Sequence, residues 1–342
     1  MKRKTLKKVQ KNGAMTNFFK SKKTKTFTLT TLTFLLLSCS KEYEIGSKDE
    51  PLKLYFVPSD NTQKIEKNAV SVKAFMEKFV SQKLYNKDEG FYIKTAVPLS
   101  HVAVVEALGT KRADFAALGT FDYVLAKDIK KLSVEAVLNI VRGENELTYK
   151  SAIIAHVDSK INNLEDLKGK KFAYVDASSA SGYILPNLLF KDKKIDLGQT
   201  VFAQRHDNVV TMVYQKQVDG GAIYYNLPKG KEMKDARARV LTQFPDVEKK
   251  VKIIGFTQEI PNAPWVLRSN LYKDPVKFTK VKDALQEGII AFMKTEEGKA
   301  AMMDLYSITG FVKTNDEDFK DVRKSFLQAY SQLEAEKKTT TK

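Results

Sequence analysis

Cysteine and histidine are scarce in this chain of 342 residues, which contains one of the first and three of the second. A single cysteine cannot form a disulfide within the chain. No group of His, Cys, Asp or Glu residues shows the spacing of metal ligands, so we expect neither a metal nor a cofactor. The sequence also contains no internal repeat, which argues against a solenoid or a propeller.

Long apolar runs are missing as well. The most apolar stretch, residues 27–37, is about half the ~20 residues that a membrane-spanning helix needs, and threonines interrupt it. Lysines precede this stretch, and Ser38 and Cys39 follow it. This order resembles a bacterial lipobox, in which the signal is cut before a cysteine that then carries a lipid.

We therefore expect residues 1–38 to be a lipoprotein signal peptide, Cys39 to be the lipid attachment site, and residues 39–50 to be a polar tether. An ordinary buried thiol and a transmembrane anchor are the alternatives. Synthesis from Met15 instead of Met1 would give a signal of more ordinary length. The expected location is the cell envelope, outside the cytoplasm, facing the periplasm and anchored to a membrane.

Charge is distributed unevenly along the chain. The net charge is +17, and ten of the Lys and Arg residues lie within residues 1–38, which hold no acid. The rest of the chain carries +7, with acidic residues interspersed. A mildly basic domain suits an anionic ligand or an anionic membrane. No basic run interleaved with aromatic residues follows Cys39, so nucleic acid is not an expected partner.

Short apolar strands alternate with amphipathic helices after the tether, which predicts an α/β fold with parallel sheets covered on both faces. At ~150 residues per domain, the length predicts two lobes. We expect a venus-flytrap arrangement with the ligand cleft between the lobes. Lobe 1 is expected over residues 51–150 and 258–336, lobe 2 over residues 151–257, and a disordered tail over residues 337–342.

A turn of small residues between an expected strand and an expected helix is the strongest candidate for ligand binding. Its sequence is Ser178-Ser179-Ala180-Ser181-Gly182. Hydroxyl groups and free backbone N–H groups at the start of a helix form a cradle for an oxyanion, and glycine lets the backbone approach closely. The alternative is a helix N-cap that binds no ligand, because serine is common at N-caps.

His206 and Asp207 stand between another expected strand and helix. We expect Asp207 to cap that helix, which leaves His206 to point into the cleft and donate to an anionic oxygen. A neutral loop histidine is the alternative. His101 and His156 lack comparable surroundings, and we interpret both as structural.

Four segments of the chain resemble the substrate-binding proteins of phosphate, phosphite and phosphonate ABC importers. These segments are Leu54–Ser59, Val104–Tyr123, Asp176–Pro186 with the later His206-Asp207 pair, and Ile260–Arg268. The likeness extends from Leu52 to about Leu333. It implies the type II periplasmic-binding-protein fold and no catalytic residues. It also implies a monomer whose partners are a small oxyanion, an ABC permease and the ATPase of that permease.

The resemblance implies further ligand contacts at Ser59, Tyr123 and Asn262, in addition to the serine turn and His206. For Tyr123 the alternative is an aromatic residue in the core of its lobe, and for Ser59 it is a plain turn. The family positions that hold the amine of an aminoalkyl phosphonate match residues that are not acidic here: Tyr225 or Asn226, and Ala263. An amine-bearing phosphonate is therefore not the expected ligand.

Two positions depart from the family pattern. Ala180 replaces a threonine, which removes one hydroxyl from the cradle, and Asp122 replaces a serine. A carboxylate beside an oxyanion requires a ligand with a proton to donate, so Asp122 as a ligand contact would favour protonated phosphate or phosphite. Asp122 capping its own helix or facing solvent is the alternative.

The sequence thus predicts a lipid-anchored substrate-binding component of an ABC importer that captures phosphate, phosphite or phosphonate. Two alternatives stay open. A sensory or virulence-associated lipoprotein of the same fold would bind an organic phosphate or a cofactor precursor. A secreted serine hydrolase would use Ser181, His206 and Asp207.

Overall fold

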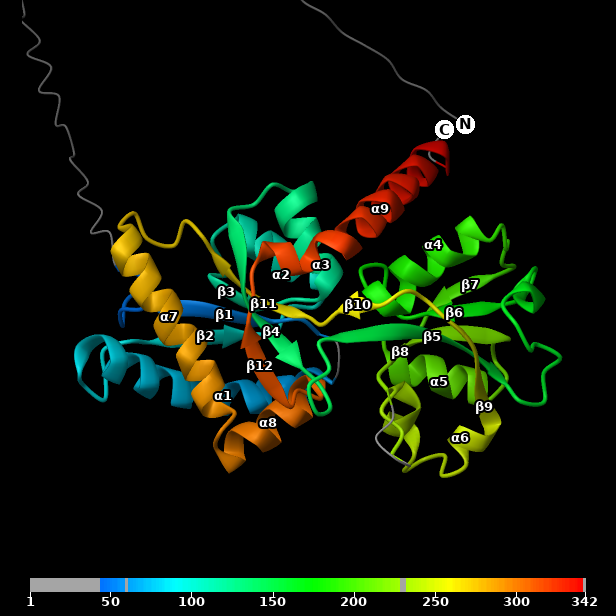
Figure 1. The fold of residues 1–342 in the computed structure, drawn as a ribbon, viewed down its shortest axis with the longest axis horizontal. Coiled ribbons are helices and arrows are strands. Elements are labelled where there is room, and N and C mark those ends of the chain that lie inside the picture. Colours follow the sequence, from blue (N-terminus) through cyan, green and yellow to red (C-terminus); the bar gives the residue numbers. More distant parts are fainter. Residues whose placement is uncertain (1–43, 59–60, 228–231, 341–342) are drawn as a thin grey trace, which may run out of the picture. The chain divides into compact units, whose positions relative to one another are not determined.

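The computed structural model describes residues 44–58, 61–227 and 232–340 (Figure 1), so the expected signal peptide, Cys39 and Ser59 lie outside the described residues. The strands are β1 (Leu52–Phe56), β2 (Ile93–Ala96), β3 (Phe115–Ala117), β4 (Val134–Val141), β5 (Thr148–His156), β6 (Phe172–Tyr174), β7 (Thr200–Phe202), β8 (Gly220–Tyr225), β9 (Val251–Phe256), β10 (Ile260–Pro261), β11 (Pro264–Arg268) and β12 (Gly310–Lys313).

The α-helices are α1 (Thr62–Tyr85), α2 (His101–Gly109), α3 (Thr120–Val124), α4 (Leu185–Asp192), α5 (His206–Tyr214), α6 (Val247–Lys250), α7 (Pro275–Phe292), α8 (Glu296–Tyr306) and α9 (Lys320–Thr340). Two π-helical turns, η1 (Leu125–Ile129) and η3 (Ala180–Ile184), adjoin α3 and α4. Shorter 3-10 turns are η2 (Glu165–Leu167), η4 (Ala236–Val240) and η5 (Asp316–Phe319).

The strands form two mixed sheets. The first has the order β12-β4-β11-β3-β1-β2, and the second has the order β10-β5-β8-β6-β7, with β9 also paired to β5. Strand β1 runs parallel to β2 and β3, and β6 runs parallel to β7 and β8, while the remaining pairs are antiparallel. The prediction of an α/β fold is confirmed. The prediction of parallel sheets is wrong for the remaining pairs. In the first sheet β11 runs opposite to β3 and β4, and β12 runs opposite to β4; in the second sheet β5 runs opposite to β8, β9 and β10.

Helices cover both faces of the first sheet, and the alternation of apolar side chains along β1 explains this. Leu52, Leu54 and Phe56 pack in one cluster with the inner faces of α1, α7 and α8. Tyr55 and Val57 pack on the opposite face, in a cluster with residues of α2, α3 and α9. Figure 1 shows α1 on the side of the sheet away from α2 and α3. The first sheet is therefore a buried middle layer.

The second sheet is covered in the same way. Ala152 and Ile154 of β5 pack in a cluster with residues of α5 and α6. Ile153 and Ala155, which alternate with them, pack in a cluster with Phe190 of α4. The period of two along β5 thus places one helix layer on each face.

The chain passes between the two sheets twice. The first sheet takes its strands from residues 52–141 and 264–313, and the second takes its strands from residues 148–261. This division follows the expected discontinuous first lobe, although the exact lobe boundaries stay a prediction. Within the described ranges, no helix is both long enough and apolar enough to cross a bilayer.

Two expected unstructured segments differ in the structure. Residues 44–50 form a turn that docks on the first sheet: Gly46 accepts a hydrogen bond from Tyr92 N–H at 2.8 Å, and Ile45 accepts one from the Tyr272 hydroxyl at 2.7 Å. The tether prediction is therefore wrong for these residues. At the other end, α9 continues to Thr340, into the segment expected to be a tail, and residues 334–338 are strong helix formers.

Candidate functional site

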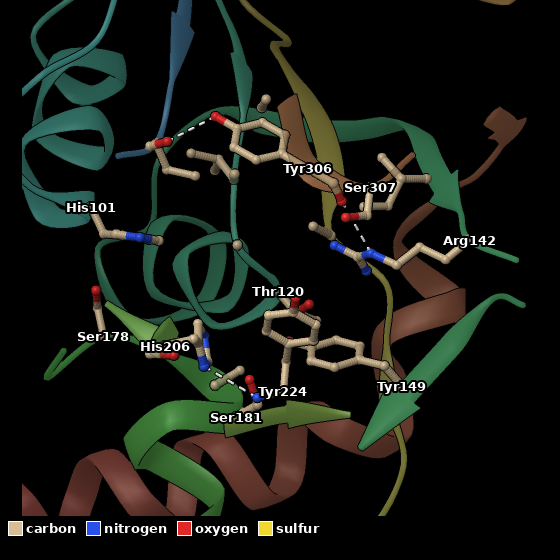
Figure 2. A pocket seen from close by; sticks show the side chains of 18 of the residues that line it. His101, Thr120, Arg142, Tyr149, Ser178, Ser181, His206, Tyr224, Tyr306 and Ser307 are labelled. Atoms are coloured by element: carbon tan, nitrogen blue, oxygen red, sulfur yellow. Dashed lines mark hydrogen bonds between the residues drawn. The ribbon is translucent and has the colours of Figure 1, made fainter. Parts of the chain in front are cut away.

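One cavity of about 120 Å³ is lined by residues from both sheet-containing halves of the fold (Figure 2). The first half contributes His101, Gly119, Thr120, Arg142, Trp265 and Tyr306, and the second half contributes Tyr149, Ser178, Ser179, Ala180, Ser181, His206, Tyr224 and Arg239. Of the predicted ligand contacts, the cavity thus brings together Ser179, Ala180, Ser181 and His206. Asp122, Tyr123, Gly182 and Asn262 do not line it.

The serine turn opens the helix formed by η3 and α4. Ser179 is its N-cap, and the Ser179 hydroxyl oxygen accepts a hydrogen bond from Gly182 N–H at 3.0 Å. The carbonyl of Ser179 accepts from the next two N–H groups, those of Tyr183 and Ile184. Within the described part of the chain, the N–H groups of Ala180 and Ser181 have no acceptor. Both are buried residues beside the cavity, where they are suited to hold an oxyanion.

Gly182 is explained by packing. A Cβ atom at this position would lie 2.5 Å from the Cβ of Val175, at the end of β6. The Gly182 carbonyl also accepts a hydrogen bond from Val175 N–H at 3.1 Å. The close backbone approach expected at this glycine is therefore made to the preceding strand.

His206 has a defined tautomer. Its Nδ1 accepts a hydrogen bond from the backbone N–H of Tyr224 at 3.1 Å, so a neutral His206 carries its proton on Nε2. The Tyr224 ring packs edge-on against the imidazole, with ring centroids 5.0 Å apart. The prediction that Asp207 caps α5 is wrong, because the carboxylate of Asp207 instead accepts two hydrogen bonds from the guanidinium of Arg205.

His101 also lines the cavity, in contrast to its interpretation as structural. Its Nδ1 lies 2.6 Å from a carboxylate oxygen of Asp122, and the same oxygen accepts from Gly119 N–H at 3.0 Å. Burial alone would lower the pKa of His101, but the negative charge and hydrogen bond of Asp122, together with the charge of Asp176, raise it above the usual range. The histidine therefore gains positive charge at the cavity edge.

Asp122 and Tyr123 are occupied elsewhere. The Asp122 bond to Gly119 N–H caps α3, which is the alternative role considered for this residue. The hydroxyl of Tyr123 donates to Asp316 at 2.7 Å, and its fully buried ring packs edge-on against Phe319. Tyr123 thus occupies the core position that the sequence left open, and direct ligand contact by either residue stays a prediction.

Arg142 follows β4 and was not singled out from the sequence. Its guanidinium donates to the Asn262 side-chain oxygen at 2.7 Å and to the Tyr306 carbonyl at 3.3 Å, and it lies 5.5 Å from the centre of the Tyr149 ring. The amide nitrogen of Asn262 donates to the carbonyls of Ile140 and Glu146, at 3.0 and 2.7 Å. Asn262 therefore holds Arg142 in place, while Arg142 lines the cavity.

The cavity is rich in donors. Burial raises the pKa of the Tyr149 hydroxyl above its usual range, so it stays protonated beside the hydroxyls of Ser181 and Thr120. Trp265 is 1 % exposed, and its indole N–H has no acceptor among the described residues. Of the described lining residues, Asp207 alone carries a carboxylate, and it is already paired with Arg205. An anion supplies the acceptors that such a lining lacks.

Comparison with known proteins identifies the family. The chain matches the periplasmic substrate-binding proteins of ABC phosphonate transporters over residues 54–319. It belongs to this family. The resemblance found in the sequence is thereby confirmed, and family members serve transport as substrate-binding proteins.

Individual members of the phosphonate-binding family are distant in sequence. The phosphonates-binding periplasmic protein of Escherichia coli is 28% identical over 211 residues, which are 59% of this chain and 57% of the relative. The phosphate-import protein PhnD of Mycolicibacterium smegmatis is 26% identical over 185 residues, which are 50% and 54% of the two chains. The chain thus spans a little over half the length of these curated relatives.

A solved structure from the same family shares the fold. The binding protein component of an ABC phosphonate transporter from Pseudomonas aeruginosa superimposes with a TM-score of 0.63 at 22% identity, over 82% of this chain and 87% of the other. The expected periplasmic-binding-protein fold is confirmed. In the described ranges, no three potential metal ligands come together.

Proposed function

We propose that this chain is the substrate-binding component of an ABC importer and captures a small phosphorus oxyanion: a phosphonate, phosphate or phosphite. The observation that carries the proposal is the donor-rich cavity. The N–H groups of Ala180 and Ser181 and the indole of Trp265 lack acceptors among the described residues. The ionised oxygens of a phosphorus oxyanion are acceptors, and their bonds to such donors are charge-assisted.

The same geometry favours binding over catalysis. His206 accepts a backbone N–H at Nδ1 and so presents a donor at Nε2, whereas a general base needs an unprotonated nitrogen facing the nucleophile. Asp207 is paired with Arg205, so it does not orient the imidazole as the third member of a triad would. We infer that the protein has no catalytic activity of its own.

The remaining parts of the proposal concern the location of the protein, its partners in transport and its membrane anchor. Family membership supports an extracytoplasmic location and a permease with its ATPase as partners. We further propose a monomer, which the family resemblance implies, and anchoring through a lipid on Cys39, which the lipobox-like sequence supports. Changing Cys39→Ser should release the protein from the membrane fraction, because the thiol that carries the lipid is gone. A variant that stays in the membrane pellet after a salt wash would refute the anchor.

Calorimetry with the variant Ser181→Ala tests the binding site. Loss of a charge-assisted hydrogen bond is worth roughly 1.5–3 kcal/mol, or about 10- to 100-fold in affinity. We expect this loss for methylphosphonate, phosphate or phosphite, whichever binds the unmodified protein best. Ser331→Ala is the matched control, because Ser331 is an exposed residue on α9. Ser181→Ala removes the hydroxyl and keeps the backbone N–H, so equal affinities would show that the Ser181 hydroxyl does not bind the ligand. Failure of all three oxyanions to bind the unmodified protein would refute the site.

A second measurement separates binding from hydrolysis. Saturable binding of an oxyanion with no turnover of a chromogenic phosphate ester or carboxylate ester supports the importer component. Turnover that disappears in Ser181→Ala would instead favour the serine hydrolase.

A further inference from the structure

Arg142 has an unusual electrostatic position for a cavity residue. It is partly buried, and within the described part of the chain no carboxylate forms an ion pair or hydrogen bond with it. Glu146 is close enough to influence the charge of Arg142, but nothing joins the two side chains. A guanidinium withdrawn from water without an anionic partner is costly unless a bound anion supplies one.

The guanidinium is also held firmly. Two of its five N–H groups donate, one to Asn262 and one to the Tyr306 carbonyl, and its plane lies near the Tyr149 ring. The other N–H groups have no acceptor among the described residues. An arginine fixed in this way presents a preorganised fork to a planar or tetrahedral anion.

Arg142 is separated from the serine turn. Figure 2 shows Arg142 on the opposite side of the cavity from Ser178 and His101, with Thr120 and Tyr149 between them in this view. The cavity volume of about 120 Å³ is several times the roughly 10–15 Å³ that one water requires. The cavity therefore has room for more than one oxyanion group.

A second cation extends this side of the lining. Arg239 also borders the cavity, where its Nε donates to the Tyr224 hydroxyl at 2.8 Å. Among the described residues that line the cavity, Asp207 is the only one with a carboxylate, and it pairs with Arg205. Among these described residues, an ammonium group on a ligand would thus meet cations and no unpaired carboxylate.

We propose that Arg142 forms a second anion-binding position, so that the cavity selects a phosphonate or phosphate carrying a second anionic group. This inference rests on the proposed function, in which the serine turn and His206 hold the first phosphoryl group. The second group is a carboxylate or a second phosphoryl, because both offer paired oxygens to the arginine fork. Aminoalkyl phosphonates are disfavoured.

Calorimetry with five probes tests the proposal: methylphosphonate, phosphonoacetate, 3-phosphonopropionate, methylenediphosphonate and 2-aminoethylphosphonate. Phosphonoacetate, 3-phosphonopropionate and methylenediphosphonate carry a second anionic group and are called bifunctional probes. We expect the best bifunctional probe to bind about 10- to 100-fold more tightly than methylphosphonate, as one additional charge-assisted contact requires. Whether a phosphonocarboxylate or the diphosphonate binds best identifies the second group. 2-Aminoethylphosphonate should bind most weakly.

Variants then assign this preference to Arg142. Arg142→Gln should reduce the affinity for the best bifunctional probe at least tenfold more than the affinity for methylphosphonate. Arg142→Lys should restore part of this difference. Ser181→Ala should weaken both probes by similar factors. Arg112→Gln is the matched control at an exposed arginine and should change neither. Unfolding midpoints of all variants show whether they are folded.

The outcomes distinguish the two proposals. If no probe binds the unmodified protein, the proposed function fails. If methylphosphonate binds as tightly as every bifunctional probe, only the second anion-binding position at Arg142 is refuted. The second position is also refuted if Arg142→Gln and Arg142→Lys both fold and weaken all probes equally, since Arg142 would then belong to the first position.

Discussion

His101 and Asp122 form the pair of residues that most directly sets the charge at the cavity edge. Asp122 is fully buried and holds Nδ1 of His101 at 2.6 Å, which leaves the other imidazole nitrogen for the cavity side. Asp122 and Asp176 are the carboxylates that act on His101. Because the pair raises the pKa of His101, a larger fraction of this side chain is cationic near neutral pH than in an ordinary histidine.

The pH dependence of stability follows from this pair. The folded pKa of His101 lies above its usual value of 6.5, so the stabilisation is fully present below pH 6.5 and is lost as pH rises through the folded pKa. We expect urea unfolding to show a stability difference between the unmodified protein and His101→Gln that shrinks as pH increases over this window.

The variant Asp122→Asn tests directly whether Asp122 raises the pKa of His101. Without the carboxylate, burial becomes the larger influence, and the His101 pKa should fall below 6.5 in an NMR titration of its ring protons. A titration midpoint that is the same in both proteins would show that Asp122 does not control His101.

The candidate site was predictable from the sequence only where its chemistry is local. Ser179 and Ser181 lie at the start of a helix, and His206 lies at the start of a helix that follows a strand, so their spacing alone marked them. Arg142 becomes informative only through its lack of a carboxylate partner and through its bond to Asn262, 120 positions away. His101 likewise depends on a partner 21 residues downstream. Such pairings arise from tertiary structure and leave no periodic signal.

At the scale of elements, the junction from β6 into η3 determines where the serine turn lies. A Cβ atom at Gly182 would come within 2.5 Å of both Cβ and Cγ2 of Val175. These atoms are fixed close to the backbone, so relief requires the strand and the helix to separate. The backbone N–H groups of Ala180 and Ser181 are therefore positioned by the contact between Gly182 and Val175.

Gly182→Ala should therefore destabilise the fold by about 1–3 kcal/mol, the usual cost of overpacking a buried contact. Gly288→Ala is the matched control in α7, where the nearest atoms belong to the flexible end of Met76. Alanine in the middle of that helix should be tolerated, because it removes the entropic cost of glycine. Urea unfolding measures both variants, and equal stabilities would contradict the packing explanation.

The order of strands and helices was largely predictable, whereas β10, β12 and the strand directions were not. Strand β12 has four residues, and β10 has two, which is too short for a pattern of alternating side chains. The antiparallel pairing of β11 with both β3 and β4 depends on contacts more than a hundred residues apart. Local propensity carries no information on that pairing.

At the scale of the whole described fold, α9 connects the two halves. Phe326 of α9 packs edge-on against Phe121 of α3, with ring centroids 5.3 Å apart. The same apolar cluster includes Leu185 and Leu188 of α4, which belongs to the half with the second sheet. A ligand that contacts both sides of the cavity would thus act on halves that already share an apolar contact.

We expect ligand binding to compact the protein, because an anion held from both halves favours their closed arrangement. Small-angle scattering with and without saturating methylphosphonate measures this change. Trp265 is the single tryptophan and lines the cavity, so its fluorescence should change along the same binding curve. Identical scattering curves combined with a saturating fluorescence change would show binding without closure.

The position of β11 in the middle of the first sheet has a consequence for the order of folding during synthesis. β11 separates β3 from β4, although it follows both by more than a hundred residues. A growing chain therefore cannot join β3 to β4 until residues 264–268 have emerged, whereas all strands of the second sheet lie within residues 148–261. We therefore expect the second sheet to be able to form during synthesis before β3 and β4 are joined in the first sheet.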